Sequence, residues 1–210
     1  QADFSREETI AAVQDFFAFA TKMYADKTAF ESPAEGGWPT ITRDSMRLFG
    51  KTDEVVDLLG HLPYPAASDL DARLQLMPAM PFAAFQHDAC FGQDDNALGL
   101  HVLTEGMIYE HVPPHIVGLT VRPVNDHGVL LDTKEGVVWW HETYPEFKSL
   151  TPFLAIGMPD DDDDAPDKHF QEAVDMVKGI YRAHGWPDLE RYRKKDCLKA
   201  IHIALRDNFP

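Results

Sequence analysis

The chain has 210 residues, of which 44% are hydrophobic, and its 35 acidic and 19 basic side chains give a formal net charge of −16. This length and hydrophobic content favour one domain over residues 1–210 with a substantial buried core. An acidic surface repels polyanions, so we expect no binding to nucleic acid or to anionic membranes. The sequence also lacks an apolar run of roughly 18 residues, the minimum for a membrane span.

The number of cysteines limits the disulfides and thiolate metal sites that the chain can form. Cys90 and Cys197 are the only cysteines, too few for a disulfide-stapled scaffold or a thiolate zinc site. Cys197 lies in an amphipathic segment, so we expect a reduced, buried thiol, with one long-range disulfide as the alternative. No signal peptide is recognisable, and we expect a cytoplasmic protein. The chain begins at Gln1, and removal of a leader would instead make it a secreted protein.

Helical signals dominate the N-terminal part of the chain. Residues 5–8 read Ser-Arg-Glu-Glu, a capping box, and apolar residues then recur at helical spacing, which predicts a helix to about Ala25. Residues 42–49 and 52–59 predict two shorter helices, the first ended by a glycine and the second capped by a threonine. We therefore expect N-terminal helices before any sheet.

Short runs rich in β-branched and aromatic residues follow an irregular stretch at residues 66–96. The Met and Phe side chains of that stretch predict a loop packed over the core, with a ligand-lining loop as the alternative. We expect strands at residues 99–104, 108–112, 116–122, 129–133 and 137–142. Residues 132–136 supply a hairpin loop and residues 125–128 the connection before it, which predicts a small antiparallel meander sheet. Helices are expected before and after this sheet rather than between its strands, so the predicted class is α+β.

Two helices are expected to close the chain. The five adjacent aspartates Asp160–Asp164 lie in an acidic loop at 159–166. Their mutual repulsion predicts an exposed linker; a Ca²⁺ site is the alternative, although the run lacks the alternating spacing of an EF-hand. A long helix is predicted over about 166–183 and a final helix over 187–206, because proline favours the first helical position.

The C-terminal segment reverses the charge of the chain. Residues 178–206 contain eight Lys or Arg and three Asp or Glu, within a chain whose net charge is −16. A solvated helix face that pairs with acidic neighbours would explain this composition. The alternative is a docking surface for a protein partner, formed by Arg191, Arg193 and Lys194.

Two adjacent indoles offer a second candidate surface. Trp139 and Trp140 fall within a predicted strand, where successive side chains point to opposite faces. One of the two is therefore expected in the core. The other is either covered by a helix or exposed as a recognition platform.

Four histidines form the strongest candidate for chemistry, because imidazole and nearby carboxylates are ligands for Zn²⁺ or Fe²⁺. They are His101, His111, His115 and His141. Prolines between His111 and His115 prevent helical spacing, and an extended chain would hold the pair about 13 Å apart at about 3.3 Å per residue. Metal ligation or acid–base catalysis is one hypothesis, and hydrogen-bonded histidines at strand ends are the other.

Other catalytic signatures are missing from the sequence. The five serines lie outside any G-x-S-x-G elbow, and no Walker or dinucleotide-binding glycine loop occurs. Cys90 follows His87 and Asp88 closely, but catalytic partners are assembled in space, so this proximity carries little information. We therefore expect no nucleotide or other cofactor.

Five segments resemble uncharacterised filamentous-fungal proteins, and they are spread over most of the chain. They are residues 37–42, 51–64, 114–120, 130–136 and 180–193. More distantly, the order of helices, short meander and closing helices is similar to the SMI1/KNR4 (SUKH) domain. The fungal likeness implies no catalytic residues, and the SUKH likeness implies a protein-interaction or immunity module.

Two hypotheses for function follow from these observations. The first is a non-enzymatic protein-interaction module that binds through Trp139 and Trp140 or through the basic C-terminal helix. The second is a hydrolase or lyase acting on a small metabolite, with the four histidines as metal ligands or acid–base groups. Convergence of the histidines in one pocket would favour the second hypothesis.

Overall fold

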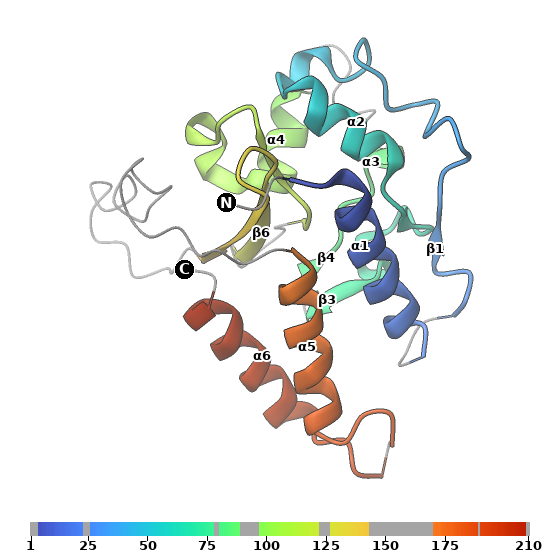
Figure 1. Ribbon diagram of the computed structural model, residues 1–210, viewed down its shortest axis with the longest axis vertical. Coiled ribbons are helices and arrows are strands. Elements are labelled where there is room, and N and C mark those ends of the chain that lie inside the picture. Colours follow the sequence, from blue (N-terminus) through green and yellow to red (C-terminus); the bar gives the residue numbers. More distant parts are fainter. Residues whose placement is uncertain are drawn as a thin grey trace.

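The computed structural model describes residues 4–22, 26–77, 80–88, 97–121, 127–142, 170–188 and 190–208. Helices and small antiparallel sheets make up these residues, which confirms the predicted α+β class. Helices come first and last along the chain, and a three-stranded meander lies between them (Figure 1). The predicted acidic loop at 159–166 lies outside the described residues.

Helix α1 (Arg6–Ala20) begins where the capping box predicts. The Ser5 hydroxyl accepts a hydrogen bond from the backbone N–H of Glu8 at 3.2 Å, which satisfies one of the free donors of the first turn. The helix ends at Ala20, earlier than predicted. Thr21 donates its hydroxyl hydrogen bond back to the Ala18 carbonyl, and such side-chain bonds compete with helix continuation.

Helix α2 (Asp53–His61) lies where the sequence predicts, but of the helix predicted at 42–49 only a 3₁₀ turn, η1 (Arg47–Phe49), is formed. Thr52 caps α2, since its hydroxyl accepts from the Val55 N–H. Gly50 ends η1 in the left-handed region at φ 66°, a conformation that glycine adopts without a steric penalty.

Where it is described, the predicted loop at 66–96 contains η2 (Leu70–Ala72), β3 (Gln75–Met77), β4 (Met80–Pro81) and α3 (Phe85–Asp88). Two further short strands, β1 (Phe30–Glu31) and β2 (Tyr64–Pro65), precede it along the chain. β1 pairs with β2 and β3 pairs with β4, both antiparallel. Met80, Phe82 and Phe85 are buried in the main core, which confirms packing over the core. The cavity beside Phe82 and Phe85 measures only about 10 Å³, room for one water at most.

Two predicted strands are helical in the structure, so that part of the prediction was wrong. Residues 99–104 belong to α4 (Ala97–Glu105), and residues 108–112 largely to the 3₁₀ helix η5 (Gly106–His111). Leu100 and Thr104, one helical turn apart, are fully buried. The burial of one face of α4 against the sheet outweighs the strand preference of its β-branched residues.

The central sheet confirms the predicted meander. Its strands β5 (Ile116–Gly118), β6 (His127–Asp132) and β7 (Val137–Glu142) pair antiparallel in the order β5-β6-β7. Gly136 takes a φ of 71° in the hairpin loop between β6 and β7, as the sequence predicts. Residues 122–126, in the connection from β5 to β6, lie outside the described residues.

The closing helices are α5 (Phe170–Ala183) and α6 (Lys194–Asn208). The prediction that Pro187 starts the last helix was wrong, because the chain turns between His184 and Arg193 before that helix. The Arg193 N–H bonds to the His184 carbonyl at 2.9 Å, which closes this turn before α6 begins.

No described helix combines the length and the apolar character needed to cross a membrane.

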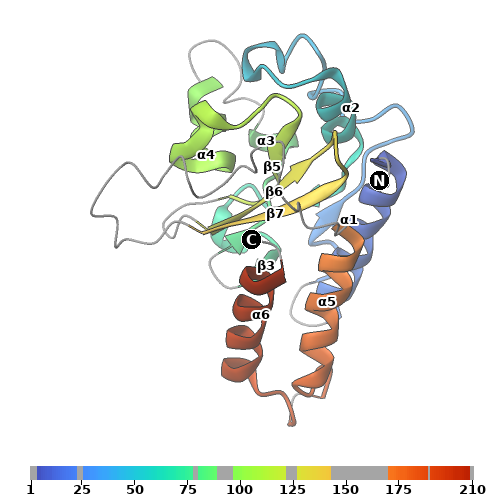
Figure 2. The same cartoon turned by 60° about the vertical axis from the view of Figure 1, so that its left-hand side comes forward.

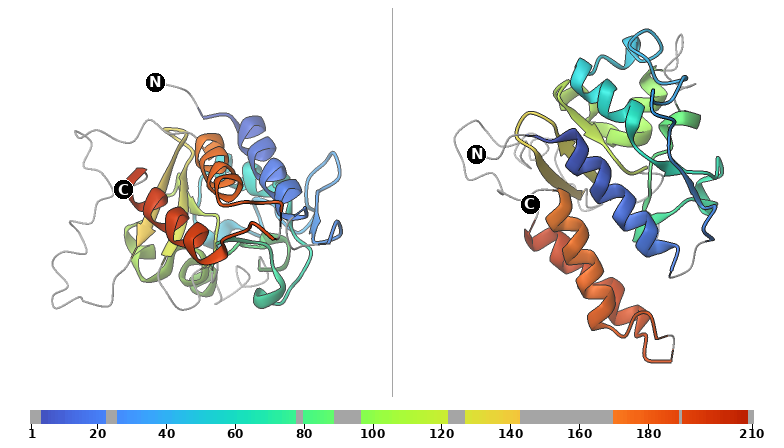
Figure 3. Two further views of the ribbon diagram at one scale, coloured as in Figure 1. Left: turned by 90° about the horizontal axis from the view of Figure 1, so that it is seen from below. Right: turned by 45° about the vertical axis from the view of Figure 1, so that its right-hand side comes forward.

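One continuous core joins the N-terminal and C-terminal helices. Its buried side chains come from every part of the described chain, from Ala12 of α1 to Leu205 of α6. α5 and α6 contact β7, whereas α4 contacts β5 and β6. Seen from below, α1, α5 and α6 lie next to one another (Figure 3). The far end of the α5–α6 hairpin projects away from the sheet (Figure 2).

Candidate functional site

His101 contacts a buried carboxylate and two aromatic rings. Its Nδ1 atom lies 2.8 Å from Oε2 of Glu105, one helical turn along α4. The Glu105 side chain is fully buried, whereas 20% of the His101 side chain is exposed. Within the described part of the chain, Nε2 of His101 has no hydrogen-bond partner, and it is not among the buried unpaired atoms. Nε2 therefore reaches solvent.

Lys51 balances the buried charge of Glu105. Its Nζ atom lies 2.5 Å from Oε1 of Glu105, and only 1% of the Lys51 side chain is exposed. Burial lowers the pKa of Lys51 below its ordinary value, while the negative charge of Glu105 opposes that shift. The pair joins the loop before α2 to the end of α4.

Aromatic rings fix the position of this polar cluster. The His101 ring lies 4.5 Å from the Phe49 ring and 5.8 Å from the Tyr109 ring, measured between centroids. Nζ of Lys51 lies 5.2 Å from the centroid of Phe49, within the range of a cation–π contact. A hydrogen bond to Glu110 raises the pKa of Tyr109, so its hydroxyl keeps its proton. We name Lys51, Glu105 and His101 the α4 cluster.

The other histidines do not join the α4 cluster. His111 is exposed, and Nε2 of His115 lies 3.8 Å from Oδ2 of Asp132 in the sheet. Among the described side chains, no three His, Cys, Asp or Glu come together as metal ligands would. The His141 side chain lies outside the described ones. The described side chains therefore do not show the convergence of His101, His111 and His115 that would favour the enzyme hypothesis.

The structure places the Trp139 side chain in the interior. Trp139 is only 7% exposed and packs with Val112, Ile116, Leu130 and Val137 in a second small core. Trp139 is therefore the core-facing indole and presents no recognition surface. Its Nε1 donor is buried without a hydrogen-bond partner among the described residues. The Trp140 side chain lies outside the described ones.

The basic residues of the C-terminal hairpin fall into two groups. Lys178 and Arg182 of α5 contact α1: Lys178 pairs with Asp15, and both cations lie over the Phe19 ring. The second group lies at and after the turn, and we name it the basic tip. It consists of Arg191, Arg193, Lys194, Lys195 and Lys199, all exposed.

The basic tip is poorly neutralised by the rest of the chain. Arg191 lies 3.3 Å from Asp188 across a solvent-exposed contact. Among the described residues, no ion pair involves Arg193, Lys194, Lys195 or Lys199. The segment therefore pairs with acidic neighbours only in part: Lys178 and Arg191 do so, whereas these four cations have no such pair within the described residues.

The start of α6 is unfavourable for the helix itself. Arg193 precedes the helix and its carbonyl accepts the Cys197 N–H, so a cation stands where Ser, Thr, Asp or Asn is preferred. Lys194 and Lys195 occupy the first turn at the positive end of the helix dipole, where only Asp196 in that turn carries the favoured charge. Local stability does not explain these three cations.

The turn that carries the basic tip is firmly held. Backbone hydrogen bonds connect Asp188 to Gly185 and Arg191 to Asp188, each between 2.9 and 3.0 Å. A Cβ atom on Gly185 would lie 2.4 Å from the Arg191 carbonyl oxygen, so the two sides of the turn touch. Trp186 is buried against Tyr192, with the ring centroids 5.7 Å apart. The cations are thus presented on an ordered support.

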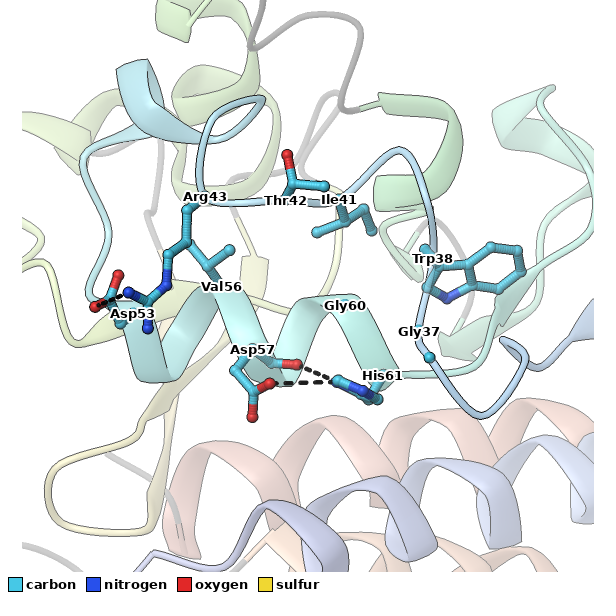
Figure 4. Close-up of a pocket in the computed structure, with 11 residues that line it drawn as sticks. Gly37, Trp38, Ile41, Thr42, Arg43, Asp53, Val56, Asp57, Gly60 and His61 are labelled. Carbon is cyan, nitrogen blue, oxygen red and sulfur yellow. Dashed lines mark hydrogen bonds and ion pairs between the residues drawn. The ribbon is translucent and has the colours of Figure 1, made fainter.

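A shallow hollow of about 240 Å³ lies beside α2 and is lined by polar side chains (Figure 4). Arg43 pairs with Asp53 at 2.9 Å, and Nδ1 of His61 lies 2.7 Å from the Asp57 carbonyl oxygen. Asp57 and His61 extend from one side of α2, whereas Thr42 lies on the opposite side (Figure 4). These groups do not point to a common centre, so the hollow lacks the arrangement of a ligand site.

Sequence reasoning missed Lys51 and Glu105 as members of a site. The signal was present, because His101 and Glu105 are four residues apart, the spacing that places two side chains together on a helix. The strand prediction for residues 99–104 concealed it, since residues four apart on a strand are about 13 Å apart.

Comparison of the chain with protein-family models, curated proteins and solved structures found no match.

Proposed function

We propose that the chain is a protein-interaction module that binds an acidic segment of a partner protein through the basic tip. The observation that carries this proposal is that Arg193, Lys194, Lys195 and Lys199 form no ion pair with the described residues of a chain of net charge −16. Cations exposed without internal partners are available to carboxylates of another protein.

Three further features support an acidic protein segment as the partner. The turn is ordered before binding, which lowers the entropic cost of association. Cations at the start of α6 oppose its own dipole, and the violation of a local rule often marks a functional position. The acidic remainder of the molecule would repel a long polyanion such as nucleic acid, but a short acidic segment need touch only the tip.

A charge-reversal experiment tests this proposal. A labelled polyglutamate peptide should bind the unmodified protein at low ionic strength, and Lys194→Glu with Lys195→Glu should lower its affinity at least tenfold. Lys22→Glu with Lys27→Glu is the matched control, because it changes the net charge equally at exposed sites outside the hairpin. Equal losses in both variants would contradict the proposal, and so would tighter binding to single-stranded DNA than to polyglutamate.

A second candidate function is an enzyme of the hydrolase or lyase type acting on a small metabolite. A separate observation favours it: Nδ1 of His101 is held by a buried carboxylate while Nε2 reaches solvent. A carboxylate on Nδ1 selects the tautomer whose Nε2 can accept a proton, as a general base requires. The α4 cluster does not include the basic tip, so separate variants test the two candidates.

A further inference from the structure

Two exposed apolar side chains lie on the elements that carry or contact His101, α4 and η1. Leu98 lies three residues before His101 on α4 and is 52% exposed, and residues three apart share a helix face. Leu48, which adjoins Phe49 in η1, is 45% exposed, and η1 contacts α4. Leu98 is thus available, on the same helix face as His101, to contact the apolar part of a ligand.

The charges of the α4 cluster are balanced beneath this surface. Lys51 and Glu105 form a buried pair of opposite charge, so the cluster offers no net charge to attract an ionic ligand. The His101 ring packs against the Phe49 and Tyr109 rings. A fixed imidazole with an exposed apolar side chain on the same helix face suits a neutral substrate that has an apolar part and a polar reacting group.

We propose that His101 is the general base of a hydrolytic site for neutral esters with an apolar acyl group. This inference rests on the second candidate function and is independent of the basic tip. His101 is the catalytic residue. Glu105 and Lys51 are positioning residues, Glu105 by holding Nδ1 and Lys51 by balancing the charge of that carboxylate.

The reaction consumes one water molecule and returns the imidazole to its starting form. Nε2 of His101 takes a proton from water while the water oxygen forms a bond to the ester carbonyl carbon. The tetrahedral intermediate then breaks its bond to the alcohol oxygen, which takes the proton back from Nε2. The products are a carboxylic acid and an alcohol, and the Nδ1 hydrogen bond to Glu105 is kept throughout.

The test is hydrolysis of p-nitrophenyl butyrate by the full chain and its variants. We expect His101→Gln to lower the protein-catalysed rate about 100-fold, the lower range for the loss of a general base, and added imidazole to restore part of it. His111→Gln is the matched control, because His111 is exposed and lies outside the α4 cluster. A rate in His101→Gln equal to that of the unmodified protein would overturn the proposal.

The positioning role needs a variant that keeps the fold. Lys51→Met with Glu105→Leu replaces the buried pair by apolar side chains of similar size, which proteins commonly tolerate. We expect this variant to unfold in urea no earlier than the unmodified protein but to hydrolyse the ester about tenfold more slowly. An unchanged rate would show that Glu105 does not position His101.

Modification by diethyl pyrocarbonate separates failure of the substrate class from failure of the whole candidate function. We expect His101 to be acylated at Nε2, as read by mass spectrometry of its peptide. Acylation without hydrolysis of the ester would overturn the ester as substrate and leave an open imidazole. Protection of His101 from the reagent would overturn both the ester as substrate and the second candidate function, because Nε2 would then be inaccessible to any substrate.

Discussion

The α4 cluster and the basic tip use the same residue type in opposite ways. Lys51 is buried and paired with a buried carboxylate, whereas Lys194 and Lys195 are exposed and lack ion pairs within the described residues. A buried cation depends on its partner, because an uncompensated charge in the interior is costly. An exposed cation has no such dependence and is free to bind another molecule. The comparison therefore separates charges that maintain the fold from charges available for function.

Removal of one partner of the buried pair should have the largest effect on stability. Lys51→Met leaves Glu105 buried without its countercharge, and we expect a loss of about 3–5 kcal/mol in the free energy of unfolding. Urea denaturation measures this loss. The double variant Lys51→Met with Glu105→Leu should recover most of it, and a failure to recover would mean that Lys51 stabilises the fold by packing rather than by charge.

The pH dependence of stability should report the same pair with a smaller effect. Burial lowers the pKa of Lys51 in the folded state from the ordinary value of 10.5. Between the two pKa values the unfolded chain binds more protons, so the contribution of Lys51 to stability rises with pH through this window. Urea denaturation at several alkaline pH values should show this slope, and its difference from the slope of Lys51→Met with Glu105→Leu isolates the effect. If the unmodified protein and the double variant show equal slopes of stability against pH, the pKa of Lys51 is not lowered in the folded state.

The glycines of the hairpin should respond in opposite directions. Gly185 has a φ of 101° and lies against the Arg191 carbonyl, so Gly185→Ala should cost about 1–3 kcal/mol. Gly179 lies inside α5, and a Cβ atom there would meet no neighbouring atom within 4 Å, so Gly179→Ala should stabilise by about 0.5–1 kcal/mol. Thermal unfolding of both variants measures the contrast, and destabilisation by Gly179→Ala would disprove the open space beside it.

The smallest expected effect on stability comes from charge reversal in the basic tip. This change should raise the stability of α6 while it lowers the affinity for polyglutamate. Lys194→Glu and Lys195→Glu place negative charge at the start of α6, which should stabilise the helix by roughly 0.3–1 kcal/mol per residue. The same variant should lose affinity for polyglutamate. Loss of both stability and affinity in denaturation and binding measurements would mean that the cations support the fold, contrary to the comparison above.

Local rules predicted the parts of the fold that depend on neighbouring residues. The capping box at Ser5, the cap at Thr52 and the hairpin glycine Gly136 lie where the sequence predicts. The prediction that Cys197 is a free, buried thiol is also confirmed, and its burial raises the pKa of that thiol. Each of these features follows from side chains within a few residues or from the pattern of a single helix.

The strand predictions that proved wrong show where local rules end. α4 has apolar and β-branched residues on most sides, so periodicity does not distinguish a buried helix from a buried strand. Close packing decided the outcome: a Cβ atom on Gly118 would lie 2.0 Å from the Thr104 carbonyl oxygen, which shows how tightly β5 contacts the end of α4. The candidate site depended on this result, because only a helix brings His101 and Glu105 together.

The sequence by itself determined the α+β class, the helix starts, the central meander and the basic character of the C-terminal segment, because composition and short-range patterns encode them. The tertiary structure decided which charges are buried and which are free. Lys51 and Glu105 are 54 residues apart in the sequence, and only the packing of α4 against the loop before α2 joins them. Lys178 and Lys194 belong to one basic segment, yet contact with α1 pairs the first and leaves the second exposed.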